Sequence, residues 1–231
     1  RSGYLSELTA DELATLTDLG LQTIVDLRRP AEVEMRPNPE LTGVTQIPVS
    51  VSIDDNEFAV IAANITDPTM GERALGIAEE YYRQAVVSRL EVYRIAVGIA
   101  VEDRHRPLLF HCTAGKDRTG IVAALLLKML GVADDIVIAD YVLTNEVRRE
   151  WFAIRELQHR EQIAAHREID IDDVDDDHLR TSRAVFLAHP EYIRATLASV
   201  VENFRDWDTF AERGLGLDPG RLHNFRRALL V

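Results

Sequence analysis

A single cysteine, Cys112, stands in this chain of 231 residues, which therefore holds no partner for an intrachain disulfide. This scarcity fits a reducing compartment. The seven histidines are scattered without the paired spacing of metal ligands, and we predict no metal and no cofactor. One acidic run lacks the glycine and the terminal glutamate of an EF-hand loop, which favours a solvated connector over a calcium site. Its members are Asp170, Asp172, Asp173, Asp175, Asp176 and Asp177.

Basic residues and long apolar runs are also scarce. The chain has 26 lysines and arginines against 39 aspartates and glutamates, a net charge of −13 that disfavours nucleic acid and anionic membranes as general partners. No apolar run reaches the roughly 18 residues of a membrane span, so we expect no stable membrane insertion. The chain starts at Arg1 without methionine, which leaves a removed targeting segment open. We expect a cytoplasmic or a secreted protein.

The chain does have enough apolar sequence for one sizeable domain. With 231 residues, 46% of them hydrophobic, and with no internal repeat or low-complexity linker, it predicts a single domain over residues 1–231. The oligomeric state is left open.

Apolar periodicity and end signals predict alternating helices and strands. Thr9 and Glu12 have the spacing of a capping box that starts a helix ending at about Asp18, and Gly20 is placed to stop it. A long amphipathic helix is predicted from the stripe Tyr82, Val86, Leu90, Tyr93, Val97 and Val101. Strands are predicted at about 23–27, 44–49 and 108–110. Helices are predicted at 121–130, beginning after a cap at Asp134 or Asp135, and beginning at Pro190. A last helix is predicted after Asp218-Pro219, with Leu222, Phe225 and Leu229 inward. This alternation favours an α/β fold, a central and mostly parallel sheet with helices on both faces.

Two further segments bear on a possible site. Asp26 and Arg28 end the strand at 23–27, at the sheet edge where ligands bind in open α/β folds, although a structural salt bridge is the plainer interpretation. Residues 51–70 mix apolar and acidic positions. We expect an ordinary loop and helix there, with a mobile flap as the alternative.

The stretch from His111 to Gly120 joins the strand that ends at Phe110 to the apolar helix that begins at Ile121. A helix N-terminus offers unpaired N–H groups and partial positive charge, so it can hold a phosphate dianion. The backbone amides of residues 113–118 would add donors around the same anion. These residues are Thr113, Ala114, Gly115, Lys116, Asp117 and Arg118. Gly115 allows the loop its conformation, and the planar fork of Arg118 can clamp two phosphate oxygens. The same positive charge favours the thiolate of Cys112 as a nucleophile.

The motif HCTAGKDRTG resembles the signature loop of the cysteine-dependent protein tyrosine phosphatase superfamily, in particular a bacterial branch of broad specificity. That branch acts on phosphotyrosine, sometimes on phosphoserine or phosphothreonine, and on phosphoinositides. Weaker matches are Arg1-Ser2-Gly3, Val25-Asp26-Leu27-Arg28, Ile138-Ala139-Asp140-Tyr141 and Glu191-Tyr192. The resemblance implies a phosphatase-like fold with a helical lid, for which residues 147–188 are the candidate. Two surface helices without a gating role are the alternative.

The chemistry that the motif predicts is phosphate monoester hydrolysis in two steps. Cys112 attacks phosphorus while Arg118 and the loop amides stabilise the equatorial oxygens, and water then hydrolyses the cysteinyl-phosphate. Many relatives carry a general acid in a Trp-Pro-Asp motif, which this sequence lacks. As the resembling branch suggests, Asp117 is our candidate acid. The alternatives are Asp54, Asp55, Asp67 or no acid.

Three neighbours have supporting interpretations. Thr119 could donate a hydrogen bond to the sulfur or cap the helix. His111 is expected to orient the loop, and Lys116 to place positive charge at the mouth, where it would favour a second phosphate on the substrate.

The sequence leaves the class of substrate open between phosphorylated proteins and phosphoinositides. We predict a protein tyrosine phosphatase, of dual or broader Tyr/Ser/Thr specificity, whose partner is a phosphorylated protein. A phosphoinositide phosphatase is the alternative, since Gly115-Lys116 resembles the loop of lipid phosphatases. A catalytically silent phosphate-binding module, a sulfurtransferase and an arsenate reductase are the remaining interpretations, and the lone cysteine argues against a thiol relay in the last.

Overall fold

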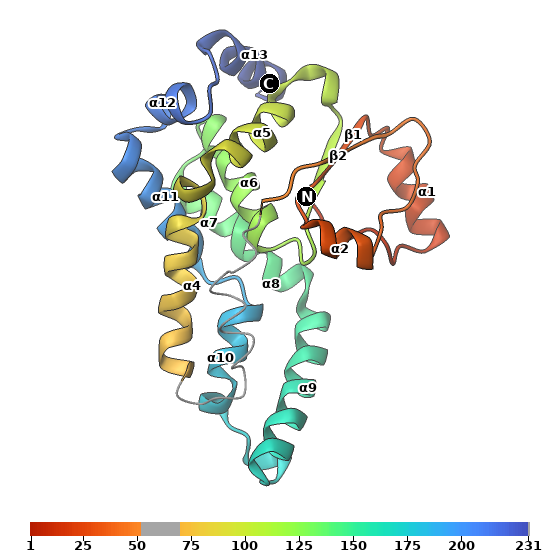
Figure 1. Ribbon diagram of the computed structural model, residues 1–231, viewed down its shortest axis with the longest axis vertical. Coiled ribbons are helices and arrows are strands. Elements are labelled where there is room, and N and C mark those ends of the chain that lie inside the picture. The colour runs from red at the N-terminus through yellow and green to blue at the C-terminus, as the bar shows by residue number, and fades with distance from the viewer. Residues whose placement is uncertain (52–69, 231) are drawn as a thin grey trace.

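The computed structural model describes residues 1–51 and 70–230, and its sheet consists of three parallel strands in the order β2-β1-β3 (Figure 1). These are β1 (Thr23–Asp26), β2 (Thr45–Pro48) and β3 (Leu108–His111). In the register, Val25 of the central strand pairs with Ile47 and with Phe110. The predicted parallel sheet is confirmed, but it is small within a mostly helical molecule.

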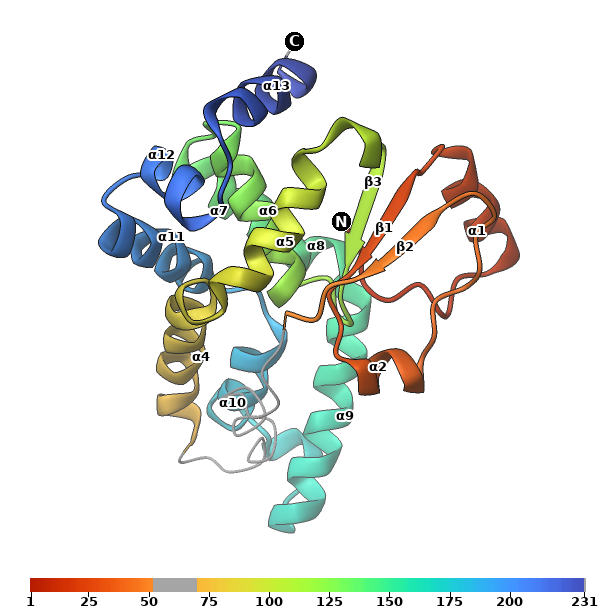
Figure 2. The same ribbon diagram turned by 45° about the horizontal axis from the view of Figure 1, so that its top comes forward.

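The two faces of the sheet are covered by different helices. On one face, Ile24 and Leu109 pack with Leu5 and with Leu16 of α1 (Ala10–Asp18). On the other, Val25 belongs to the main core together with Ile121 and Leu125 of α6 (Asp117–Met129). Figure 2 shows α1 and α6 on opposite sides of the strands. This arrangement confirms an α/β fold with helices on both faces.

Helix α6 is the central helix of the molecule. Its residues from Thr119 to Leu125 are all buried, as the apolar sequence predicts for a helix covered on every side. It packs against α5 (Leu90–Val101), α7 (Asp134–Val142) and α11 (Pro190–Phe204). The strand before it and the core around it together hold its N-terminus in place.

The single long helix predicted around residues 82–101 is wrong. Helix α4 (Gly71–Ala85) ends near Val86, a 3₁₀ turn η2 (Val87–Arg89) follows, and α5 then starts in a new direction (Figure 1). The apolar stripe is nevertheless in the core, because both helices turn the same side chains inward. Periodicity reports which residues are buried, and a tight turn of a few residues hardly disturbs it.

Helix ends follow the sequence signals in part. The capping box of Thr9 and Glu12 is present at α1, and Gly20 has a φ of 64°. Asp218 caps α13 (Pro219–Leu229), where Leu222 and Phe225 are buried, but Leu229 is 47% exposed and was wrongly placed inward. Helix α7 is preceded by Ala133, so Asp134 and Asp135 lie in its first turn and are not its cap. There they still favour the helix electrostatically.

A long hairpin of helices projects from the body (Figure 1). It consists of α9 (Arg149–Arg167), a 3₁₀ turn η4 (Ile171–Asp173) and α10 (Asp176–Phe186), and α10 packs along α4. The acidic run lies at its tip, where Asp170 and Asp175 cap η4 and α10. The remaining elements are α2 (Pro30–Met35), η3 (Asp103–His105), α8 (Thr144–Val147), α12 (Trp207–Thr209) and a π-helical turn η5 (Phe210–Gly214).

Within residues 1–51 and 70–230, no helix has the length and apolar character that crossing a membrane requires. The loop and helix expected for residues 51–70, and the flap that was the alternative, lie almost wholly outside the described residues.

Candidate active site

The predicted phosphate loop joins the end of β3 to the start of α6, at the carboxyl edge of the sheet. Cys112 directly follows the strand and is 1% exposed, and Asp117 is the first residue of the helix. The backbone N–H of Gly115 donates to Cys112 Sγ at 3.2 Å. The sulfur therefore lies at the positive end of a helix and already accepts one backbone hydrogen bond.

Gly115 is required for two reasons. Its φ of 69° is in the left-handed region, and a Cβ there would lie 2.8 Å from backbone atoms of Ser2 and Gly3. Tyr4 also donates its N–H to the Thr113 carbonyl at 3.1 Å. The segment around Ser2 to Tyr4 therefore supports the loop from outside, which is where the weak Arg1-Ser2-Gly3 match of the sequence falls.

Arg118 is held by a carboxylate that the sequence reasoning missed, Glu32 of α2. The two ends of the guanidinium donate to the two oxygens of Glu32, Nη1 at 2.7 Å and Nη2 at 2.8 Å. Thr113 Oγ1 donates to the same carboxylate at 2.5 Å. A bidentate pair of this kind fixes the plane of the guanidinium. Nη1 and Nη2 also have longer contacts to the Leu27 carbonyl at 3.4 Å and to Thr113 Oγ1 at 3.3 Å, which leaves Nε–H as the donor for a phosphate. Its signal in the sequence was a glutamate just beyond the carboxyl end of β1.

The contact between Glu32 and Arg118 shifts the pKa values of both groups. Burial alone would raise the pKa of Glu32, but the hydrogen bonds from Arg118 and Thr113 hold it well below its usual range. Burial alone would lower the pKa of Arg118, and the bond to Glu32 raises it. Both groups are therefore charged at neutral pH.

Asp117 is held by a buried tyrosine pair. Tyr82 Oη donates to Asp117 Oδ1 at 2.6 Å, and the hydroxyls of Tyr82 and Tyr141 lie 2.6 Å apart. Burial first, and then the charge of Asp117, raise the pKa of Tyr82 well above its ordinary value, so its hydroxyl keeps its proton and donates. The apolar stripe in the sequence predicts that Tyr82 is in the core, but no local pattern indicates its contact with the loop.

Lys116 does not place charge at the mouth, and that expectation is wrong. The residue is 2% exposed, and Nζ donates to the carbonyls of Val185 at 2.5 Å and Leu187 at 3.2 Å. Nζ also lies 3.1 Å from Asp117 Oδ1. Burial lowers the pKa of Lys116, although Asp117 opposes the effect. The side chain thus connects the loop to the end of α10.

His111 contacts the loop backbone as expected. It is fully buried, with Nδ1 3.2 Å from the Cys112 carbonyl and Nε2 3.1 Å from the side-chain nitrogen of Asn38. The side-chain nitrogen of Asn38 can only donate, because the amide oxygen accepts from Arg28. This assigns the ring proton to Nδ1, from where it donates to the carbonyl. Burial lowers the pKa of His111, so the ring is neutral.

Thr119 fits neither of its two interpretations. Its hydroxyl is buried without a hydrogen-bond partner in the described part of the chain, so it does not donate to the sulfur there. The residue preceding α6 is Lys116, so Thr119 does not cap the helix either.

Asp26 and Arg28 form the structural salt bridge. Arg28 Nη2 lies 2.7 Å from Asp26 Oδ2, and both side chains are almost fully buried. The alternative acids Asp54, Asp55 and Asp67 lie outside the described residues.

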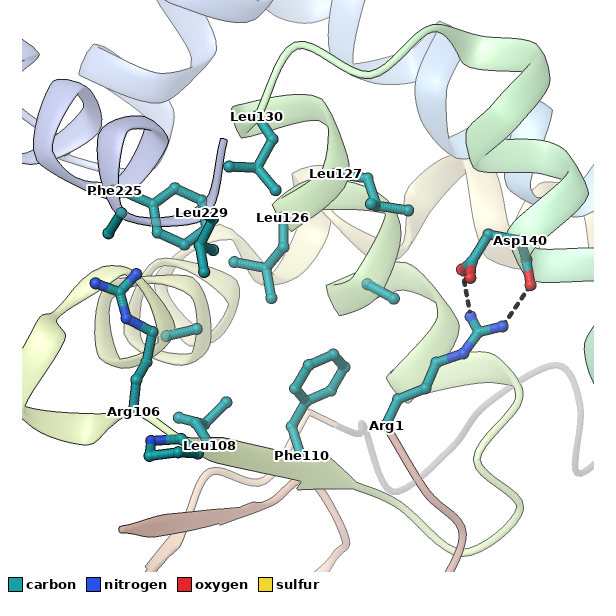
Figure 3. A pocket seen from close by; sticks show the side chains of 14 residues that line it. Arg1, Arg106, Leu108, Phe110, Leu126, Leu127, Leu130, Asp140, Phe225 and Leu229 are labelled. Carbon is teal, nitrogen blue, oxygen red and sulfur yellow. Dashed lines mark hydrogen bonds and ion pairs between the residues drawn. The ribbon is translucent and has the colours of Figure 1, made fainter. Parts of the chain in front are cut away.

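A separate hollow of about 670 Å³ lies between β3, α6 and α13 (Figure 3). Leu108, Phe110 and Leu126 line it, and Arg1 pairs with Asp140 at its edge. None of the loop residues 111–119 lines it.

The loop as a whole combines the parts needed for phosphoryl transfer. A buried sulfur at a helix N-terminus, an oriented guanidinium and a carboxyl in one short segment can attack, stabilise and protonate a phosphate monoester. Among residues 1–51 and 70–230, no three His, Cys, Asp or Glu side chains gather as metal ligands would.

Comparison with known proteins agrees with this geometry. The sequence model of the tyrosine phosphatase family matches residues 1–231. A Cupriavidus necator protein named among the tyrosine-protein phosphatases is 32% identical over 160 residues, 63% of this chain and 52% of the relative. The triple specificity protein phosphatase PtpB of Mycobacterium tuberculosis is 32% identical over 169 residues, 63% of this chain and 60% of the relative. A tyrosine-protein phosphatase of Nostoc commune is 28% identical over 62% of this chain and 47% of its own length. The chain thus spans about half the length of the curated relatives that it matches.

Proposed function

The chain belongs to the tyrosine phosphatase family, and from this premise we propose that it hydrolyses phosphate monoesters, phosphotyrosine first among them, through a cysteinyl-phosphate. The observation that carries the proposal is the placement of Cys112 Sγ at the N-terminus of α6, with Gly115 N–H donating to it at 3.2 Å. Glu32 holds Arg118 beside the same loop.

In the first step, Cys112 Sγ attacks phosphorus in line with the bond to the leaving oxygen. The S–P bond forms as that P–O bond breaks, and the loop amides and Arg118 carry the charge on the equatorial oxygens. Asp117 donates a proton to the leaving oxygen. Its position in the first turn of α6 and the hydrogen bond from Tyr82 support this role.

In the second step, water attacks phosphorus and the S–P bond breaks. The carboxylate of Asp117 takes the proton from the water, and inorganic phosphate leaves. One carboxyl thus serves as acid in the first step and as base in the second.

Residues 147–188 are proposed as a lid over this site. Support comes from Lys116, which joins the phosphate loop to the Val185 and Leu187 carbonyls near the end of α10. A movement of α10 would therefore shift the phosphate loop, and closure of the lid would exclude water during the reaction.

The breadth of the substrate range rests on the relatives. One of them is named a triple specificity protein phosphatase, which favours a substrate range broader than phosphotyrosine alone. Phosphoinositide hydrolysis stays an alternative. Lys116 is the main feature of the sequence that motivates this alternative, and its side chain is buried and donates to the Val185 and Leu187 carbonyls.

The test is phosphate release in the presence of chelator, from a phosphotyrosine peptide and from a soluble phosphoinositide headgroup. We expect the wild type to release phosphate from the peptide and Cys112→Ser to release none above background. Equal activity of the Ser variant would refute cysteine catalysis. Faster release from the headgroup would replace the proposed substrate class with the alternative.

A further inference from the structure

A smaller cavity of about 300 Å³ adjoins the phosphate loop, with Thr113 and Ala114 in its wall. The rest of the wall comes from Tyr4, from Arg28 beyond the end of β1, from α2 with the residue that follows it, and from Arg148 with the first turns of α9. Four arginines and a single acid, Glu32, are among its lining residues. In a chain with a net charge of −13, such a local excess of positive charge calls for an explanation.

Two of the four arginines are neutralised within the protein. Arg28 is paired with Asp26, and Arg36 lies 3.0 Å from the Glu7 carboxylate. The other two belong to the start of α9. Among the described residues, the Arg148 side chain makes no hydrogen bond or ion pair, and the Arg155 side chain donates only to the neutral Gln158, at 3.0 Å. Two guanidinium groups in this cavity therefore have no counter-ion in the part of the chain that the structure describes.

Stacking holds these two guanidinium groups in place. The Arg148 guanidinium lies 3.9 Å from the centroid of the Trp151 ring, and that of Arg155 lies 5.2 Å from it. Phe186 packs edge-on against the same ring at 5.5 Å. Cation–π stacking fixes the plane of a guanidinium without using its N–H donors, which stay available for an anion.

The cavity is close enough to the catalytic loop to act with it. Burial lowers the pKa of Arg148, and the nearby charges of Asp117 and Cys112 oppose that effect, so the three groups share one electrostatic neighbourhood. Arg155 lies seven residues further along α9, about 10 Å along the helix axis. The cations thus form a stripe that leads away from the loop.

We propose that Arg148 and Arg155, stacked on Trp151, form a second anion subsite, which binds an anionic side chain of a phosphopeptide near the phosphotyrosine in the loop. This inference rests on the proposed function. The anionic group is a carboxylate or a second phosphate, since a guanidinium fork binds both. The length of the stripe favours a peptide, because about three residues of extended chain span about 10 Å.

The experiment compares kcat and KM on three phosphotyrosine peptides of one length. They carry, within three residues of the phosphotyrosine, neutral side chains, glutamates or a phosphoserine. The variants are Arg148→Gln, Arg155→Gln and their combination. The matched control is Arg149→Gln, which makes the same change of charge on the same helix at an exposed residue outside the cavity.

We expect the wild type to prefer at least one anionic peptide by about tenfold in kcat/KM, as hydrogen bonds to charged groups allow. The double variant should lose this preference, mainly through a higher KM on the anionic peptides, and should lose clearly less on the neutral peptide. Arg149→Gln should keep the preference. The glutamate and phosphoserine peptides show which anion the subsite takes.

Three outcomes would overturn the subsite. In the first, the wild type shows no preference for anionic over neutral peptides. In the second, the double variant loses as much kcat/KM on the neutral peptide as on the anionic ones. In the third, Arg149→Gln reduces the preference as much as Arg148→Gln does. If turnover of a soluble inositol phosphate depended on Arg148 as strongly as turnover of the anionic peptides does, the ligand of the subsite would be a phosphoinositide headgroup and not a peptide. Failure of the wild type on all phosphotyrosine peptides would instead refute the proposed function.

Discussion

At the residue scale, side chains from outside the phosphate loop hold Arg118 and Asp117, its proposed catalytic groups, in place. Arg118 has its plane set by Glu32, and Asp117 has one oxygen set by Tyr82. Neither holding group belongs to the motif. A catalytic group that is fixed before substrate arrives loses less entropy in the transition state, so these contacts bear directly on rate.

Asp117→Asn tests the assignment of the general acid. The amide can neither protonate the leaving oxygen nor take a proton from water, so we expect kcat to fall by about 10²-fold or more. The loss should be largest on phosphotyrosine and smaller on an aryl phosphate with an acidic leaving group, which needs no proton. Steady-state rates on the two substrates measure the difference. Wild-type turnover on phosphotyrosine would show that Asp117 is not the acid.

At the scale of elements, the packing of α6 on α7 requires a glycine. A Cβ on Gly120 would lie 2.8 and 2.9 Å from carbons of the Tyr141 ring. Tyr141 cannot move freely, because its hydroxyl contacts Tyr82, which in turn donates to Asp117. Close approach of the two helices and the position of the Asp117 carboxyl are therefore linked.

Gly120→Ala should lower the free energy of unfolding by about 1–3 kcal/mol, the usual cost of overpacking a core. Displacement of Tyr141 should also lower kcat. Gly98→Ala is the control, since a Cβ there meets nothing within 4 Å and Gly98 lies inside α5. It should be neutral or stabilising by up to about 1 kcal/mol. Denaturant unfolding of the two variants makes the comparison, and equal stability would contradict the packing argument.

At the scale of the whole molecule, several buried ionisable groups respond to acid in the same direction. Against the effect of burial, hydrogen bonds hold the pKa values of Glu32 and Asp26 below their usual range. Burial lowers the pKa of His111. In each case the unfolded chain binds protons more readily than the folded one, so stability falls as pH falls.

We expect the free energy of unfolding to decline below about pH 6.5, where His111 would be protonated in the unfolded chain. The decline should steepen below about pH 4, where unfolded carboxylates are protonated as well. Urea unfolding at several pH values from 7.5 to 3.5 measures the profile. Glu32→Gln should flatten the part below about pH 5, and a wild type that gains stability on acidification would contradict the sign.

The sequence by itself determined the features that contiguous residues decide. A strand, an anion-binding loop and a buried helix follow one another from Leu108 to Met129, and each is read from local apolar pattern and from Gly115. The caps at Thr9 and Asp218 are local for the same reason. The parallel sheet followed from the alternation of such elements.

Only the tertiary structure decided which distant side chains meet around the loop. Glu32 lies 86 residues from Arg118, Tyr82 lies 35 from Asp117, and the Val185 carbonyl lies 69 from Lys116. The turn at η2 and the burial of Lys116 likewise depend on how whole helices pack. A sequence pattern indicates whether a side chain prefers the core or solvent. The partner of a charged side chain depends on where the packed helices place a second segment of the chain, and no local periodicity contains that placement.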